Sequence, residues 1–450
     1  MASFNFQSVL MHGQMFLVQS VELEGRLDAG FYQYNRNDID TVKLSSLIRI
    51  QGGKRLPQGE NYSETSTDYL YFRVSDMTEY QSTCFDNCKF ISEKIYLALK
   101  RYELFENELI ISIAGTIGKV QVVDNFPKDK KIILTENCAK LSIKDRSKLL
   151  PEYLDLILKT DFVQQQIFVS SIQTTIPKLG LDKILSLKIP KIPHIRKQES
   201  IVALMNKSVL TKVRTDKQAQ TLLNSINDYL LNELQIELPQ TDNSLENRIF
   251  TVQMNEISGG QFDAQSQFNK HYRIQGGKYK NEQLNKLAIL QKGQSITSDE
   301  VIEGDYPVIA GGQSSPYNHY IANHNGNVIT VSASGAYSGY VWYHDYPIFA
   351  SDCTMVFSRN EDRISTEFLA EILKLKQQEI YLLQKGAGQP HVYASDLEKL
   401  EIPVPPLVTQ KKIINHIRQI RQTAINLQID ANNELMQTKA NIEKMILGAS

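Results

Sequence analysis

The sequence repeats one pattern of prolines and helical spacing in its two halves. The stretch "LKIPKIPHIRKQESIVALM", which begins at Leu187, is echoed by "LEIPVPPLVTQKKIINHI", which begins at Leu400. Each stretch has a Leu-x-Ile-Pro core, a second proline three residues later, a glutamine and then an apolar run with helical spacing. This repetition constrains the fold more than any local motif, because each copy must form a similar structural unit.

Further matches follow in the same order in both halves. The matched segments are RLDAGFYQYN (26–35) with QFDAQSQFNK (261–270), KLSSLIRIQGGKR (from Lys43) with KLAILQKGQS (from Lys286), LIISIAGTIGKVQVV (from Leu109) with VITVSASGAYSGYVWY (from Val328), TENCAKLSI (from Thr135) with ASDCTMVFS (from Ala350), PEYLDLIL (from Pro151) with TEFLAEIL (from Thr366), and QTTIPKLGLDKI (from Gln173) with GAGQPHVYASDL (from Gly386). The first pair places Asp28 opposite Asp263. We interpret the chain as a tandem duplication.

Composition narrows the class of protein. A chain of 450 residues with 42% hydrophobic content is too long for one ordinary core, which favours two domains or more. The 49 basic and 50 acidic residues nearly cancel, but a folded protein can still have one basic groove. The four cysteines are too few and irregular for a disulfide framework and favour a reducing compartment. Cys84 and Cys88 lack a second pair with suitable spacing, so we expect no metal site.

The amino terminus lacks the basic and then apolar pattern of a signal peptide. No segment reaches the roughly 20 apolar residues that a membrane span requires. The sequence therefore predicts a soluble, cytoplasmic protein.

Each half has the same internal plan. Its first part is rich in β-branched and aromatic residues in short alternating runs, separated by Gly, Pro, Asn and Asp, which predicts mixed β structure. "PEYLDLILKTDFVQQQIF" and "TEFLAEILKLKQQEIYLL" then each predict one amphipathic helix. The expected fold class is α+β, with two tandem mixed-β domains.

A long helix is expected after each β domain, over residues 194–238 and 406–448. Apolar residues recur there at three- and four-residue steps without an internal glycine or proline. About forty residues make a rod near 60 Å long, and its single apolar stripe needs a partner. We expect the two helices to pack as an antiparallel coiled coil with pseudo-two-fold symmetry. Two independent helical hairpins are the alternative. The polar segment "ELPQTDNSLENR" predicts a linker over 239–260.

The sequence offers no catalytic constellation. "GTIGKV" at 115–120 lacks the glycine interval and the hydroxyl residue of a phosphate-binding loop, so we interpret it as a turn between strands. "VPPL" around Pro405 lacks the amide or acid and the aromatic residue of an amino-methyltransferase motif. The histidines form no H-x3-H pair. The chain is therefore predicted to be no enzyme and to hold no metal or cofactor.

The whole chain resembles the specificity subunit of type I restriction-modification systems. The resemblance is carried by the order of the blocks and by "RLDAGFY" (26–32), "ISIAGTIGKV" (111–120), "TTIPKLGLDKILSLKIPKIP" (174–193) and "HIRKQESIV" (194–202). The second half departs further, since "SGAYSGYV" has one more residue than "GTIGKV". The resemblance implies target-recognition domains at 1–193 and 261–405, each followed by its long helix.

The resemblance also implies a function and partners. Each recognition domain would read one half of a bipartite DNA target, and the helical spacer would set the gap. The chain would direct adenine methylation and DNA cleavage by partner subunits. The expected partners are double-stranded DNA, two DNA methyltransferase subunits and a motor-nuclease subunit. S-adenosylmethionine is expected on the methyltransferase partner.

Candidate DNA contacts are the basic, amide and aromatic side chains near the repeated turns, because such groups reach phosphates and base edges. They are Lys54, Arg55, Arg73, Lys119 and Lys178 in the first half, and Lys292, Gln294, Tyr337, Lys385, Gln389 and His391 in the second. For each, an ordinary solvated surface role is the alternative. Gly115, Gly118, Gly335 and Gly339 are interpreted as backbone requirements. Pro177 and Pro390 are expected in rigid turns near the DNA.

Two other classes of function stay open at this point. One is an autonomous DNA methyltransferase or nuclease with an unfamiliar site. The other is an interaction scaffold that binds no DNA, which would show no salt-dependent affinity for duplex DNA.

Overall fold

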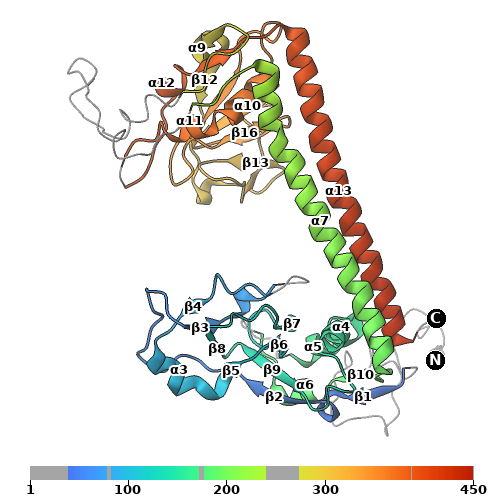
Figure 1. Cartoon of the computed structure of the whole chain (residues 1–450). Helices are drawn as coiled ribbons and strands as arrows, with labels where there is room; N and C mark the ends of the chain where they lie inside the picture. Colours follow the sequence, from blue (N-terminus) through green and yellow to red (C-terminus); the bar gives the residue numbers. More distant parts are fainter. Residues whose placement is uncertain (1–38, 79–82, 172–176, 240–272, 387, 449–450) are drawn as a thin grey trace, which may run out of the picture. The chain divides into compact units, whose positions relative to one another are not determined.

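The computed structural model describes residues 39–78, 83–171, 177–239, 273–386 and 388–448. The chain divides into two compact units, residues 1–216 with 429–450, and residues 217–428 (Figure 1). Residues 240–260 of the expected linker, and the repeated Asp28 and Asp263, lie outside the described residues.

The first unit contains a central four-stranded antiparallel sheet with strand order β2-β9-β6-β7. Its strands are β2 (Ile48–Gly52), β9 (Cys138–Ile143), β6 (Leu109–Ser112) and β7 (Val120–Val122). A second sheet has the order β4-β3-β8-β5, with β3 and β8 parallel. Its strands are β4 (Lys89–Phe90), β3 (Tyr69–Phe72), β8 (Lys131–Leu134) and β5 (Glu103–Leu104). A short ladder pairs β1 (Thr41–Lys43) with β10 (Lys188–Pro190).

The alternation of side chains along β6 explains how the first unit builds its core. Leu109 and Ile111 pack with the helices, whereas Ile110 packs with residues of the second sheet such as Phe72 and Leu134. Successive side chains of a strand point to opposite faces, so three consecutive residues of β6, Leu109 to Ile111, are apolar because both faces of the strand are covered. The helices of this unit are α3 (Glu93–Leu99), α4 (Pro151–Leu158), α5 (Asp161–Ser170) and α6 (Leu181–Leu185).

The second unit repeats this arrangement. Its central sheet has the order β12-β18-β15-β16, made of β12 (Ala288–Lys292), β18 (Cys353–Ser358), β15 (Val328–Ser332) and β16 (Val341–His344). A smaller sheet has the order β14-β13-β17, with β13 and β17 parallel, made of β14 (Asn318–His319), β13 (Tyr306–Ile309) and β17 (Phe349–Ala350). A short ladder pairs β11 (Asn281–Gln283) with β19 (Glu401–Pro403). The helices are α9 (Leu284–Leu287), α10 (Thr366–Leu375), α11 (Gln377–Tyr381) and α12 (Ala394–Leu397).

The equivalent strand order confirms the tandem duplication, but one predicted pairing is wrong in its register. The matched sequence segments predict that Lys43 and Lys286 are equivalent. In the structure Leu44 and Leu284 are equivalent, because their N–H groups donate to the equivalent carbonyls of Leu187 and Leu400, each at 2.9 Å. The repeated hydrogen bond sets the register here, and the repeated lysines are not equivalent.

The helix predicted from Pro151 is also wrong in detail, because two helices form where one was expected. Helix α4 ends at Leu158, and α5 starts again after Thr160, whose side chain accepts from the N–H of Val163. The same break separates α10 from α11 at Lys376. A threonine that caps the next helix favours a break, since its side chain competes with the backbone for hydrogen bonds.

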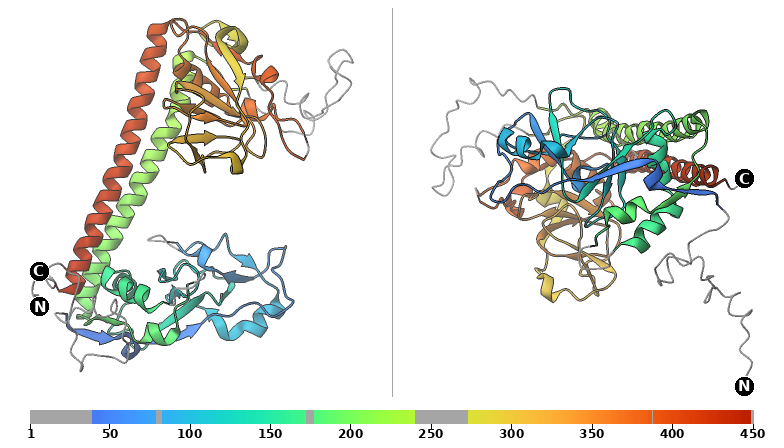
Figure 2. Two further views of the ribbon diagram at one scale, coloured as in Figure 1. Left: turned by 180° about the vertical axis from the view of Figure 1, so that it is seen from behind. Right: turned by 90° about the horizontal axis from the view of Figure 1, so that it is seen from below.

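The two long helices are α7 (Ile195–Leu234) and α13 (Leu407–Leu447). In the second unit Glu233 pairs with Lys412 at 3.2 Å, and the ring of Tyr229 lies 4.3 Å from that of His416. One residue number rises as the other falls, so these stretches run antiparallel. In the first unit the beginning of α7 packs with the end of α13, with Met205 and Ile442 in one core (Figure 2). Pairing of the long helices is therefore confirmed within each unit.

A buried glutamine at the start of each long helix explains why both proline-containing stretches repeat a glutamine at this point. Gln198 and Gln410 have no exposed surface. The Oε1 atom of Gln410 accepts from the N–H of Ser365, and its Nε2 donates to the carbonyls of Arg363 and Pro405, all three at 2.9 Å. Gln198 makes the equivalent three bonds in the first unit. One amide thus ties three segments together at the point where the β domain meets its helix.

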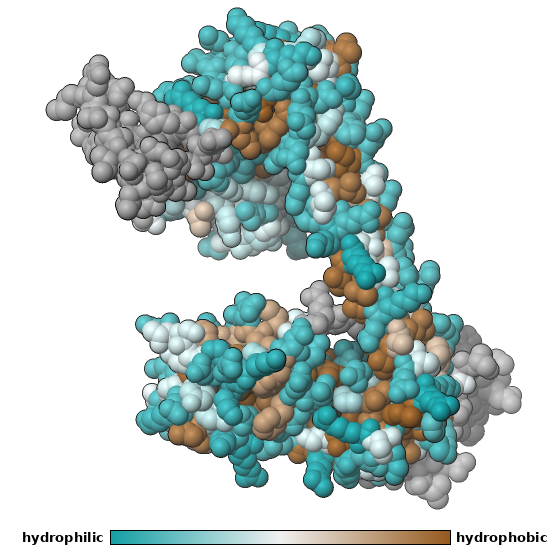
Figure 3. Space-filling view, in the orientation of Figure 1, coloured by the Kyte–Doolittle hydropathy of each residue, from teal (hydrophilic) through white to brown (hydrophobic). Residues whose placement is uncertain are grey.

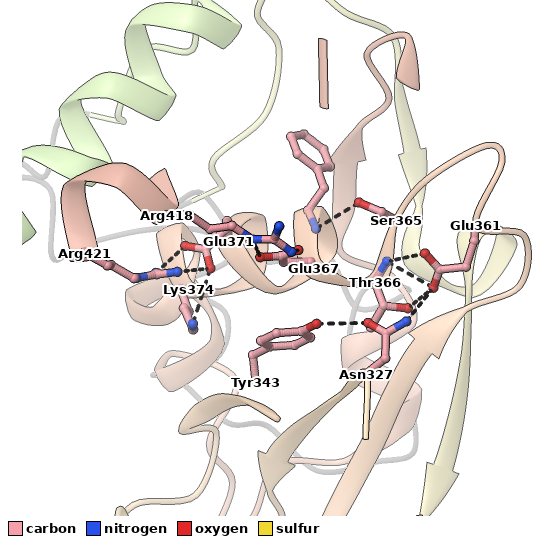
Figure 4. A network of polar contacts seen from close by, with 11 residues as sticks. Asn327, Tyr343, Glu361, Ser365, Thr366, Glu367, Glu371, Lys374, Arg418 and Arg421 are labelled. Atoms are coloured by element: carbon pink, nitrogen blue, oxygen red, sulfur yellow. Dashed lines mark hydrogen bonds and ion pairs between the residues drawn. The ribbon is translucent and has the colours of Figure 1, made fainter. Parts of the chain in front are cut away.

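In the second unit a network of ion pairs adds to this junction (Figure 4). Arg421 of α13 binds Glu371 of α10 through both terminal nitrogens, at 2.8 and 2.6 Å. Glu371 is 1% exposed, so its carboxylate depends on this partner and on Lys374 at 3.4 Å. Arg418 binds Glu367 one helical turn away.

None of the helices in the described parts of the chain has the length and apolar character that crossing a bilayer requires.

Candidate nucleic-acid interface

The same glycine turn lies beside the same proline segment in both units. In the first unit the N–H of Gly115 donates to the carbonyl of Pro177 at 3.1 Å. In the second unit the N–H of Gly335 donates to the carbonyl of Pro390, also at 3.1 Å. The turn after β6 or β15 and the proline segment that precedes β10 or β19 are therefore brought together twice by one hydrogen-bonding pattern.

The turn requires its glycines. Gly115 and Gly118 have φ angles of +74° and +79°, and Gly335 and Gly339 have +86° and +92°. These angles lie in the left-handed region, where a Cβ atom is strained. The interpretation of these glycines as backbone requirements is confirmed, and "GTIGKV" is the turn from β6 to β7.

A further pair of glycines, Gly53 and Gly293, was not singled out from the sequence. These glycines fix the positions of the residues that follow them, Lys54 and Gln294. A Cβ atom on Gly53 would lie 2.0 Å from the Thr135 carbonyl oxygen, and one on Gly293 would lie 2.1 Å from that of Ser351. At both positions the glycine backbone packs directly against the backbone of another segment, which leaves no room for a side chain. As a result Lys54 and Gln294 occupy equivalent positions just after these glycines.

Three of the five first-half candidates face solvent. Lys54 and Arg55 are exposed beyond β2, and Lys178 is exposed where it bridges to Ala114 of the glycine turn. The N–H of Ile113 in that turn donates to the carbonyl of Asn137 at 2.7 Å. The structure therefore brings these three side chains to one region of the first unit.

The other two first-half candidates are engaged within the protein. Arg73 holds Asp76 through two bonds of 3.0 and 2.7 Å, and its terminal nitrogen also donates to the carbonyl of Asn87. The ammonium group of Lys119 donates to the carbonyl of Met77. Their roles in DNA binding stay predictions, but both side chains already donate hydrogen bonds within the protein, and only Arg73 has an acidic partner.

A cavity of about 370 Å³ lies beside Arg55. Aromatic rings and hydrogen-bonding groups line it together. The lining residues are Arg55, Leu56, Asn61, Tyr62, Tyr71, Arg73, Val74, Ser75, Thr135, Glu136 and Asn137. Asn137 belongs to this lining, and its carbonyl accepts from the N–H of Ile113 beside the glycine turn, so the cavity and the turn are neighbours.

In the second unit four candidates are exposed. Lys292 is the last residue of β12 and Gln294 lies two residues beyond it. Tyr337 lies in the glycine turn with 49% of its surface exposed, and Gln389 precedes the turn proline. Each of these side chains can reach a ligand without rearranging the core.

The remaining two second-half candidates belong to a small cluster. Lys385 pairs with Asp396 at 2.6 Å, and its ammonium nitrogen lies 5.8 Å from the centre of the Tyr393 ring. The ring of His391 stacks with that of Tyr393 at 6.2 Å. Since Asp396 balances Lys385, the exposed ring of Tyr393 is the more accessible feature of this cluster.

Sequence reasoning missed the acidic residues of both surfaces. Glu136 holds Arg55, and Asp352 accepts a hydrogen bond from Ser334 of the glycine turn. The matched segments "TENC" and "ASDC" each contain an acid, which lies two residues before Cys138 in the first and directly before Cys353 in the second. An acid beside each repeated cysteine is the sequence signal for these residues, although the two acids are not at equivalent positions.

Nothing in the described parts of the chain groups three or more metal-binding side chains. Cys88 is buried in the core, and burial raises the pKa of its thiol, which opposes formation of the thiolate that metals bind. The four cysteines are free thiols.

The model of the type I restriction modification DNA specificity domain family matches residues 36–227 and 277–437. The chain belongs to this family. The two matches cover the two β domains and most of each long helix, which agrees with the duplication that the sheets show. The fold class predicted from the sequence, tandem mixed-β domains each followed by a long helix, is confirmed.

The similarity to two individual members of this specificity-domain family is low and covers about a third of the chain. The chain is 30% identical over 156 residues to the type I restriction enzyme MjaVIII specificity subunit of Methanocaldococcus jannaschii, which is 32% of this chain and 36% of that protein. It is 25% identical over 139 residues to a type I specificity subunit of Mycoplasma pneumoniae, which is 29% of this chain and 44% of that protein. The chain thus spans less than half the length of these two relatives.

A solved structure shares the fold. It comes from a study of complex assembly and conformational transition of the type I restriction-modification system. The TM-score is 0.53 at 15% identity, and the alignment covers 91% of this chain and 96% of that one.

Proposed function

We propose that this chain is the DNA sequence-recognition component of a type I restriction-modification complex. The observation that carries the proposal is one turn-and-proline scaffold, built twice, that presents a different set of side chains in each unit. Loops on a rigid β scaffold are where recognition residues concentrate, because loop side chains can vary while the sheets hold their position. Membership of the specificity-domain family supports the same function.

The target halves are proposed to differ in sequence. Equivalent positions are occupied by Lys54 and Gln294, and by Lys178 and His391. Lysine offers only donors, whereas glutamine and histidine both donate and accept. Surfaces with different donors and acceptors select different base edges, so each recognition domain should read its own half-site.

The partners are proposed to be two methyltransferase subunits and a motor-nuclease subunit, with S-adenosylmethionine bound by the methyltransferase. The exposed faces of the long helices support a protein partner, since large apolar side chains reach solvent there (Figure 3). They are Leu210 and Val213 on α7, and Val408, Ile425, Ile429 and Met436 on α13. The chain itself is proposed to have no catalytic role and to act in the cytoplasm, where free thiols persist.

The experiment is equilibrium binding of the full chain, assembled with its methyltransferase subunit, to a random duplex library at several salt concentrations. We expect selection of one split motif and an affinity that falls steeply as salt rises, because phosphate contacts release counterions. Binding that selects no sequence, or that ignores salt, would contradict the proposed function.

A further inference from the structure

Arg55 differs from the other candidate cations of the first unit in how it is held. Its Nε atom donates to Oε1 of Glu136 at 2.8 Å, while 80% of its side chain is exposed. Its two terminal nitrogens have no hydrogen-bond partner among the described residues. The guanidinium is therefore fixed on one side and open on the other.

Glu136 is itself fixed by the protein interior. Its Oε2 atom lies 3.0 Å from the hydroxyl of Tyr71 and 3.1 Å from that of Thr135. Tyr71 is 2% exposed, so one end of this network is anchored in the core. Burial works to raise the pKa of Glu136, but the hydrogen bonds from Arg55, the backbone, Tyr71 and Thr135 outweigh it and hold the pKa below its usual value. The carboxylate that positions Arg55 is thus ionised at neutral pH.

The charge balance of this pair argues against a simple phosphate contact. Arg55 and Glu136 together carry no net charge, which weakens attraction to a phosphate. A fork of two N–H donors instead matches a neutral partner with two neighbouring acceptors. Guanine offers O6 and N7 side by side in the major groove, and no other base shows two acceptors there.

The other cations of this surface lack the same combination. The guanidinium of Arg73 already donates to Asp76 and to the carbonyl of Asn87. Lys178 is exposed, but an ammonium is a point donor without a planar fork. The second unit has no equivalent device, because Ser295 and Ser351 stand at the positions of Arg55 and Glu136.

We propose that Arg55 reads a guanine in the half-site bound by the first unit, through its two terminal nitrogens, and that Glu136 is its positioning residue. This inference rests on the proposed function. Arg55 and Asn137 both line the cavity, and the carbonyl of Asn137 accepts from Ile113 beside the glycine turn, so a base edge placed at the cavity meets the fork.

The test combines protein variants with a modified base. The full chain, assembled with its methyltransferase subunit, is bound to duplexes that carry its selected motif with each guanine in turn replaced by 7-deazaguanine, which lacks the N7 acceptor. We expect one guanine in one half-site to lose on the order of tenfold in affinity on this replacement. With Arg55→Ala the same replacement should have no further effect, because the two changes remove the same hydrogen bond.

Two more variants separate base reading from other roles. Arg55→Lys keeps the charge but loses the planar fork and the Nε bond to Glu136, so discrimination at that guanine should fall, and by less than in Arg55→Ala because an ammonium can still donate to O6 or N7. Glu136→Gln should also lower discrimination, while affinity for unrelated DNA rises because the Arg55 charge is no longer balanced. Glu60→Gln is the matched control, since Glu60 pairs with exposed Lys94 at 2.6 Å and both pairs have similar exposure.

The outcomes separate this inference from the proposed function. A selected motif whose guanines all tolerate the replacement, or an Arg55→Ala variant with unchanged discrimination at every guanine, overturns the inference and leaves the function standing. An Arg55→Ala variant that loses affinity equally for all sequences, with a shallower salt dependence, shows a phosphate contact and also overturns it. A complex that selects no motif overturns both.

Discussion

Single buried side chains account for the most regular part of the sequence. The repeated stretches that begin at Leu187 and Leu400 place a glutamine where a β domain joins its helix. Gln410 satisfies one N–H and two carbonyl groups there. A buried amide with all partners in place favours one geometry over others, because each alternative leaves polar groups without partners.

Gln410→Ala should therefore destabilise the second unit by about 2–3 kcal/mol, since the three backbone groups lose their partner. The protein has one tryptophan, and Trp342 lies in β16 of this unit. Urea unfolding followed by its fluorescence measures this unit specifically. Gln220→Ala is the control, because Gln220 is exposed on α7 and, among the described residues, its side chain bonds to Asn224 alone. A Gln410 variant as stable as the control would disprove the structural role.

His344 makes the stability of the second unit depend on pH. Burial, and then the charge of Lys374, lower the pKa of this histidine to about 4. The neutral ring bonds to Thr330 at 2.9 Å and lies 4.9 Å from the ring of Trp342. A histidine with a lowered pKa stabilises the fold fully above its unfolded value near 6.5, and the contribution is lost as pH falls from there to about 4.

The free energy of unfolding of the second unit should thus fall by roughly 2–3 kcal/mol between pH 6.5 and pH 4 because of His344. Urea unfolding at a series of pH values, followed by Trp342 fluorescence, measures it. His344→Gln should have a flatter pH dependence over this range. Equal slopes in the variant and the natural protein would show that other groups cause the change.

At the scale of helices and strands, the contact between the long helix and the shorter helix of the β domain is built from different residues in the two units. Arg421 and Glu371 link α13 to α10 in the second unit, whereas Val209 and Leu156 stand at these positions in the first and belong to its apolar core. An apolar pair and a buried ion pair can replace each other, because removing both charges avoids their desolvation.

Arg421→Met should destabilise the second unit by about 3 kcal/mol, since Glu371 is left buried with only Lys374 as a partner. The double variant with Glu371→Leu should recover most of this loss, as the first unit implies. Arg418→Met should cost less than about 1 kcal/mol, because its pair with Glu367 is more exposed. Chemical denaturation followed by Trp342 fluorescence would measure all three, and a double variant no better than Arg421→Met would contradict the account.

The elements also show what the sequence could and could not predict. The duplication, the strand-rich domains and the long helices followed from periodicity and repeated motifs. The division between α4 and α5 did not, because the apolar spacing continues through Thr160 and only the hydrogen bond to Val163 reveals the cap. The engagement of Arg73 by Asp76 was also hidden, since the charge of a side chain does not show which partner holds it.

For the whole molecule, the proposed role of the long helices predicts how the target changes with their length. Removing two turns from α7 between Lys212 and Gln220, with a matched cut in α13, shortens the spacer by about 10 Å. The gap in the recognised target should then shorten, by at most about three base pairs, while both half-sites stay the same. Sequencing of methylated sites for the shortened protein measures both quantities. Altered half-sites with an unchanged gap would contradict this role.

The most direct test of the proposed function is genome-wide sequencing of methylated bases in the source organism, with and without this gene. The account predicts the loss of one split motif that is methylated on both strands, with a guanine in the half assigned to the first unit. A methylation pattern that does not change when the gene of an active system is deleted would contradict it.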